Sequence, residues 1–239
     1  NVAVGANAGD AITTGYDNIL VGVSASTNLT TGYRNIYVGS STANSQVYGR
    51  DNIAIGFNAG YSTVGSDFNT LIGHYAGYKL GDTGGTGGDN DGDSSYNTAI
   101  GYEAMGGGDD TQANNVAAVC VAVGYHALGG STRGSDGGAI TGDGTVAVGG
   151  HALEALTSGA GNTAIGYKAG LETQTGSKSV VIGYEAANNT ANLLGDSNIL
   201  IGYQCGGVGQ WEGASNNNTI IGANAFNGVV NQSHTNTGV

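Results

Sequence analysis

The stretch that decides the fold is Asn162-Thr163-Ala164-Ile165-Gly166-Tyr167-Lys168-Ala169-Gly170. Versions of it recur twelve times along the 239 residues, each with a glycine at the position of Gly166. The steps between successive glycines are 17, 17, 17, 17, 28, 23, 25, 17, 17, 19 and 20 residues. A fixed period with occasional insertions is typical of a solenoid, in which each unit buries its apolar surface by stacking on the next. These motif glycines are Gly5, Gly22, Gly39, Gly56, Gly73, Gly101, Gly124, Gly149, Gly166, Gly183, Gly202 and Gly222.

The three residues before each motif glycine predict a short β-strand. In the quoted repeat they are Thr163, Ala164 and Ile165. The first and third are Val, Ile or Thr in every copy and share one face, while the middle residue, also apolar, lies on the other. A strand that is apolar on both faces is expected to be buried on both. The chain's own coil covers one face, so we expect identical chains to cover the second.

An asparagine four residues before the glycine predicts a stacked ladder of side-chain amides that satisfies backbone groups, rather than a ligand site. A second glycine about seven residues before the motif glycine, as at Gly159, predicts two short strands in each turn. The expected fold is therefore all-β, a parallel β-roll or β-solenoid of about twelve short turns. It forms one domain over residues 1–227, followed by a tail or linker over residues 228–239. Nine copies carry the asparagine, namely Asn1, Asn18, Asn35, Asn52, Asn69, Asn97, Asn162, Asn198 and Asn218, and the other three carry Cys120, Thr145 and Ser179.

Composition excludes several function classes. The formal net charge of −12, with six basic residues against eighteen acidic ones, argues against binding to nucleic acid or to an anionic membrane surface. The longest apolar runs are about five residues, whereas a membrane-spanning helix needs roughly 20. Cys120 and Cys205 lie about four turns apart, too far for a disulfide, so we expect buried free thiols.

Three insertions interrupt the period, at residues 78–96, 106–114 and 129–144. The first contains Asp89, Asp91 and Asp93 in the alternating pattern of oxygen ligands that calcium prefers. A solvated loop without metal explains the same residues, because Asp and Gly are common in turns. Successive insertions at one corner of a solenoid often build a binding surface, although simple tolerance of longer loops is an equal alternative.

The residue after the motif glycine becomes an aromatic column. Stacked tyrosines can form a platform for sugars, as in a receptor contact, or simply pack on the turns above and below. Next to this column, His126 and His151 fall in adjacent turns and could share a metal ion, although no third ligand is evident. No arrangement of nucleophile, base and acid recurs, so we expect that the protein is not an enzyme. The tyrosines concerned are Tyr102, Tyr125, Tyr167, Tyr184 and Tyr203.

The run Thr163-Ala164-Ile165-Gly166 resembles the Val-Ala-Ile-Gly core of the head repeats of YadA-like trimeric autotransporter adhesins, as do residues 53–56 and 121–124. It is equally similar to the Asn-Thr-Ala-Ile-Gly-Tyr repeats of bacteriophage tail fibres. The resemblance implies a left-handed, homotrimeric β-roll that attaches to host surfaces or matrix. Here Asn stands where the adhesin motif has Ser, and the 17-residue period is longer than that of the adhesins.

These observations predict a non-enzymatic fibrous structural or attachment protein, the shaft or head of a trimeric tail fibre or surface adhesin. We expect it to be extracellular, at a cell surface or on a virion. Its partners would be its own copies in a homotrimer and a host-surface glycan or protein, with calcium as the one candidate cofactor. The alternative is a monomeric β-solenoid that binds a surface or a small ligand, such as ice, a glycan or calcium.

Overall fold

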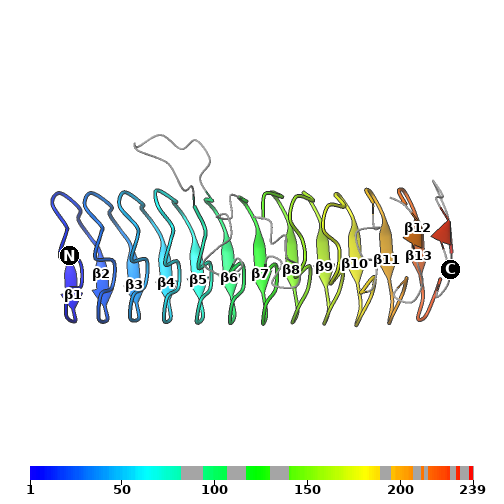
Figure 1. The fold of residues 1–239 in the computed structure, drawn as a ribbon, viewed down its shortest axis with the longest axis horizontal. Coiled ribbons are helices and arrows are strands. Elements are labelled where there is room, and N and C mark those ends of the chain that lie inside the picture. Colours follow the sequence, from blue (N-terminus) through cyan, green and yellow to red (C-terminus); the bar gives the residue numbers. More distant parts are fainter. Residues whose placement is uncertain are drawn as a thin grey trace.

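The computed structural model describes residues 1–81, 94–106, 117–129, 140–188, 195–206, 211–212, 215–226, 230–231 and 237–238. Over these ranges the chain forms a long row of short strands that stand side by side from the N-terminus to the C-terminus (Figure 1). Within the same ranges, no helix is long and apolar enough to cross a membrane.

The row is one parallel sheet of thirteen strands, which follow one another across the sheet in chain order. Equivalent residues of successive repeats face each other, so that Val180 pairs with Thr163 and Val181 with Ala164. This architecture confirms the predicted all-β, parallel β-solenoid. The strands are β1 (Val2–Val4), β2 (Ile19–Val21), β3 (Ile36–Val38), β4 (Ile53–Ile55), β5 (Thr70–Ile72), β6 (Thr98–Ile100), β7 (Val121–Val123), β8 (Val146–Val148), β9 (Thr163–Ile165), β10 (Val180–Ile182), β11 (Ile199–Ile201), β13 (Thr219–Ile221) and β15 (Thr237–Gly238).

The core lies behind the sheet and is lined by the middle residue of each strand. From β2 to β13 these middle residues are at most 2% exposed. The alanine three residues after the motif glycine is buried beside them, for example Ala59 and Ala169. The small side chain lets the two halves of each turn approach closely, so the solenoid is thin. The middle residues are Leu20, Tyr37, Ala54, Leu71, Ala99, Ala122, Ala147, Ala164, Val181, Leu200 and Ile220.

The prediction of a second short strand in each turn was wrong for the described residues. Among the described residues, the one separate two-stranded sheet lies near the C-terminus, where β12 (Trp211–Glu212) pairs with β14 (Val230–Asn231). In an early turn, the backbone N–H groups of Thr13, Thr14 and Gly15 all donate to the carbonyl of Thr30. Because three donors share one acceptor, this segment forms a bend and not a ladder.

The motif glycine is required by its backbone conformation. Gly166 has φ of +135°, and a Cβ there would collide with the carbonyl oxygen of Gly183 in the next turn. The equivalent glycines have φ between +130° and +144°, a region that other residues rarely adopt. The glycine therefore allows successive turns to stack at the spacing of a parallel sheet.

The asparagines before the strands form the expected ladder. The Oδ1 atom of Asn35 accepts hydrogen bonds from both the backbone N–H and the side-chain amide of Asn52. The Asn52 amide also donates to the carbonyl of Ser66, at 2.8 Å. From Asn18 onward each of these side chains is buried and links its own turn to a neighbouring turn, which is a structural role. The same pattern holds at Asn18 and Asn198, and Asn162 donates to the carbonyl of Gly176.

Candidate functional site

The candidate site is the outward face of the sheet together with the residues at its two edges. The first and third residues of each strand point away from the core, and we call these two columns the ladder. In the strands of the large sheet from β1 to β13, the ladder consists only of Val, Ile and Thr. Its large side chains are partly exposed along the whole row, with Ile100 at 38% and Ile165 at 41%. The described part of the chain leaves this face uncovered.

The tyrosine column runs along one edge of the ladder, at the position after the motif glycine. Its five predicted members, Tyr102, Tyr125, Tyr167, Tyr184 and Tyr203, are between 40% and 51% exposed. Tyr102 and Tyr125 stack with ring centroids 5.5 Å apart, and Tyr184 and Tyr203 stack at 5.7 Å. Since these ring faces are turned toward each other, the column presents mainly ring edges and hydroxyl groups to solvent.

Position 150 interrupts this column, because Gly150 stands there. The imidazole of His151 lies between Tyr125 and Tyr167, edge-on to both, with centroid distances of 5.1 and 5.9 Å. The Tyr167 side chain also has the Lys168 ammonium over its ring, 5.2 Å from the centroid. The aromatic column is therefore continuous from Tyr102 to Tyr203, with a histidine in the place of one tyrosine.

A cluster of imidazoles and carboxylates lies next to the tyrosine column. The Nε2 atom of His126 is 3.0 Å from a carboxylate oxygen of Glu103, and the Nδ1 atom of His151 is 2.7 Å from a carboxylate oxygen of Glu154. The two imidazole rings stack at 5.6 Å, which agrees with their predicted position in adjacent turns. The described residues contain no group of three or more His, Cys, Asp or Glu side chains arranged to hold a metal ion. The hydrogen bond to Glu103 raises the pKa of Tyr102 above its ordinary value.

Sequence reasoning missed Glu154, the buried member of this cluster. Its side chain is only 6% exposed and contacts His151 from three residues further along the chain. It lies outside the repeated motif, so the column pattern could not identify it. The available signal was the spacing of three between His151 and Glu154 in a tight bend.

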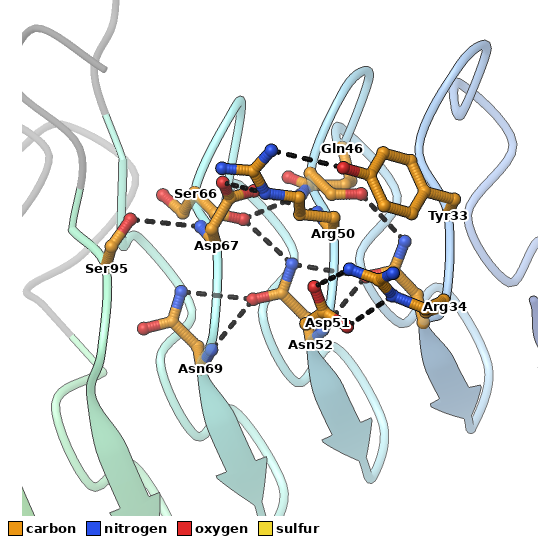
Figure 2. A network of polar contacts seen from close by, with 12 residues as sticks. Tyr33, Arg34, Gln46, Arg50, Asp51, Asn52, Ser66, Asp67, Asn69 and Ser95 are labelled. Carbon is orange, nitrogen blue, oxygen red and sulfur yellow. Dashed lines mark hydrogen bonds and ion pairs between the residues drawn. The ribbon is translucent and has the colours of Figure 1, made fainter.

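A network of arginines and aspartates lies before the strands at the opposite edge of the ladder (Figure 2). The Arg34 guanidinium donates two hydrogen bonds of 2.7 Å to Asp51, one turn further on. Arg50 forms an ion pair with Asp67 through its Nε atom, at 2.9 Å, and its backbone N–H donates to the other carboxylate oxygen of Asp67. Arg34 lowers the pKa of the Asp51 carboxyl, whereas burial raises the pKa of the Asp67 carboxyl. The 17-residue spacing of each pair equals the basic repeat period, so the sequence carries a signal for both pairs.

The remaining predicted residues fall into two groups. Cys120 and Cys205 are buried free thiols, as expected, and burial raises the pKa of both. The candidate calcium ligands Asp89, Asp91 and Asp93 lie outside the described residues, as do most of the three insertions.

Comparisons of the chain with protein-family models, with curated proteins and with solved structures found no match.

Proposed function

We propose that this chain is a non-enzymatic, fibrous attachment protein whose copies pack side by side, as a homotrimer, through the ladder. In this proposal it forms the shaft or head of a tail fibre or surface adhesin, outside the cell or on a virion. The edges of the fibre, including the tyrosine column, then meet the host surface.

The observation that carries the proposal is the uncovered ladder. Every one of its side chains is Val, Ile or Thr, so the face has no charge anywhere along its length. Large exposed apolar patches mark interaction surfaces, because water contact with such a patch is unfavourable. A second copy of the same chain is the natural occupant, since it offers an equally long and equally uncharged face with the same repeat distance.

The size of the face also suits a stable assembly. Twelve strands at about 4.8 Å each give a length of roughly 55 Å. Two columns of side chains make the face about 15 Å wide, hence on the order of 800 Å², the area that each partner buries in a standard interface. The resemblance to trimeric adhesin and tail-fibre repeats selects three copies over two.

Light scattering on the purified chain tests the assembly. The expected native mass is about 70 kDa, three times the 23.5 kDa of one chain. A mass of one chain would contradict self-association and favour the alternative of a monomeric solenoid that binds a surface or a small ligand. Repeating the measurement with a chelator shows whether calcium contributes to the assembly.

A matched pair of variants locates the interface. We expect the double variant Ile100→Asp and Ile165→Asp to dissociate the assembly, because both side chains lie in the ladder. Ser158→Asp introduces the same charged group at an exposed position away from the ladder and should leave the native mass unchanged. Equal effects of the ladder and control variants would contradict the proposed interface.

A further inference from the structure

The two most exposed large apolar side chains of the described residues are Val119, at 61%, and Tyr96, at 60%. With Phe68, at 39%, they occupy the position five residues before the motif glycine in three successive turns. Phe68 and Tyr96 stack with ring centroids 4.9 Å apart. The Phe68 ring also has the Arg50 guanidinium over it, 5.7 Å from the centroid. We call these three residues the aromatic edge.

The aromatic edge and the tyrosine column flank the ladder on opposite sides. Along β6, exposure alternates from Tyr96, which is exposed, through the buried Asn97 and Ala99 to the exposed Tyr102. Between the two edges, the outward side chains of this strand are the two ladder residues, Thr98 and Ile100. Tyr96 and Tyr102 are six residues apart in a nearly extended chain, which separates them by roughly 15–20 Å.

Symmetry determines which edges meet when copies associate. Suppose that parallel copies turn their ladders toward a common axis along the fibre. The edge of each copy that carries the aromatic edge then lies beside the edge of the next copy that carries the tyrosine column. This head-to-tail arrangement closes into a ring, and it keeps equivalent turns at the same height. The edges that meet are then the position before β6 on one copy and the position after β6 on its neighbour.

We infer that the aromatic edge of one copy packs against the tyrosine column of a second copy. This inference rests on the self-association proposed above and names the side chains that make the contact between adjacent copies. At equal height, Tyr96 meets Tyr102 and Val119 meets Tyr125, while Phe68 meets His74. All six side chains are exposed in the single chain, and pairing them buries apolar and aromatic surface on both sides.

The neighbouring turns are compatible with the same pairing. At β8 the two edge residues are Gly144 and Gly150, and at β9 they are Gly161 and Tyr167. Each pair contains at least one glycine, so the two edges can approach each other without a clash. At β10 the exposed Lys178 would lie beside Tyr184, which allows a cation–π contact. The charged residues Arg34 and Asp51, at the same edge near the N-terminus, neutralise each other within one chain.

A cysteine cross-link distinguishes this pairing from any contact within one chain. The background carries Cys120→Asn and Cys205→Ala, the usual residues of their columns, so that no native thiol interferes. In the double variant Tyr96→Cys and Tyr102→Cys, oxidation or a short bifunctional thiol reagent should link neighbouring copies. A disulfide needs Cα atoms within about 7 Å, which the two positions of one chain cannot reach. We expect a covalent species on a denaturing gel with as many chains as the native assembly.

Two controls make the result decisive. Tyr96→Cys with Tyr167→Cys uses the same columns three strands apart and should give no cross-link. Tyr96→Cys alone should also give none, and a linked dimer there would show that like edges meet and would overturn the inference. A native assembly of unchanged mass without the 96–102 cross-link would overturn the edge pairing alone, whereas a monomeric chain would overturn the proposed function as well.

Discussion

The two sides of each strand use similar apolar residues but meet different surroundings. Ala164, the middle residue of β9, is fully buried, whereas its neighbour Ile165 is 41% exposed. The inward positions contact the next turn of the same chain, and their identity is fixed by those contacts. The outward positions meet nothing in the described part of the chain. Inward residues thus determine the fold, and outward ones are free to determine what the surface of the solenoid contacts.

The neighbouring glycines Gly149 and Gly150 show this contrast within two residues. Gly149 has φ of +130°, and a Cβ there would collide with the carbonyl of Gly166. Gly150 lies at the outward position, where the nearest atom to an added Cβ is a Tyr167 ring carbon at 3.4 Å. One glycine is required by the stacking of turns, while the other has room for a side chain.

Substituting each of these glycines should give the largest difference. We expect Gly149→Ala to destabilise the fold by at least about 3 kcal/mol, because backbone strain adds to the collision with the next turn. Gly150→Ala should change the free energy of unfolding by about 0.5 kcal/mol or less. Denaturant unfolding followed by circular dichroism measures both. Similar effects of the two substitutions would remove the contrast between inward and outward positions.

A second test removes one member of the asparagine ladder. Asn52→Ala leaves the backbone N–H of Asn69 without its acceptor in the interior, while the carbonyl of Ser66 loses one donor and keeps the Gln46 amide at 3.1 Å. Since one unsatisfied buried group costs about 1–3 kcal/mol, we expect a loss in that range. Asn28→Ala is the matched control, because Asn28 is exposed and its amide makes one bond, to Asn44. A comparable loss in the control would mean that the asparagine ladder stabilises the fold no more than an exposed hydrogen bond does.

The asparagine ladder is weaker where Cys120 replaces asparagine, and a single substitution can restore it. The backbone N–H of Thr145 there meets only the Cys120 sulfur, at 3.5 Å, and sulfur is a weak acceptor. Cys120→Asn provides a carbonyl for Thr145 and an amide for the carbonyl of Gly142, which the thiol now contacts at 3.4 Å. We expect a gain of about 1 kcal/mol in the free energy of unfolding. A loss would show that the interior at β7 has adapted to the smaller thiol.

The features that the sequence predicted are those that repeat. The motif glycine, the asparagine ladder and the parallel strands follow from spacing, because each acts between equivalent positions of adjacent turns. The side on which the core lies could not be predicted, since Ala164 and Ile165 are both apolar. The turn geometry around Gly166 makes that choice. Glu154 was missed because it contacts His151 from outside the repeat, and the stacking of Tyr102 on Tyr125 turns ring faces away from solvent, which no spacing reveals.

The smallest expected effect comes from two aspartates that lie on adjacent turns. The pKa of Asp51 is lowered by Arg34, so its stabilising effect is present above its ordinary pKa of about 3.9 and is lost as the pH falls below that. The pKa of Asp67 is raised by burial, so its protonated form suits the fold, and its contribution is present at low pH and lost as the pH rises through the raised value. Relative to their Asn variants, the wild-type chain should therefore lose stability at Asp51 and gain it at Asp67 as the pH falls from 7 to 3.5. Urea unfolding of Asp51→Asn and Asp67→Asn across this range measures the two signs. If the stability contributions of both aspartates changed in the same direction with pH, burial would not explain the difference between these two carboxylates.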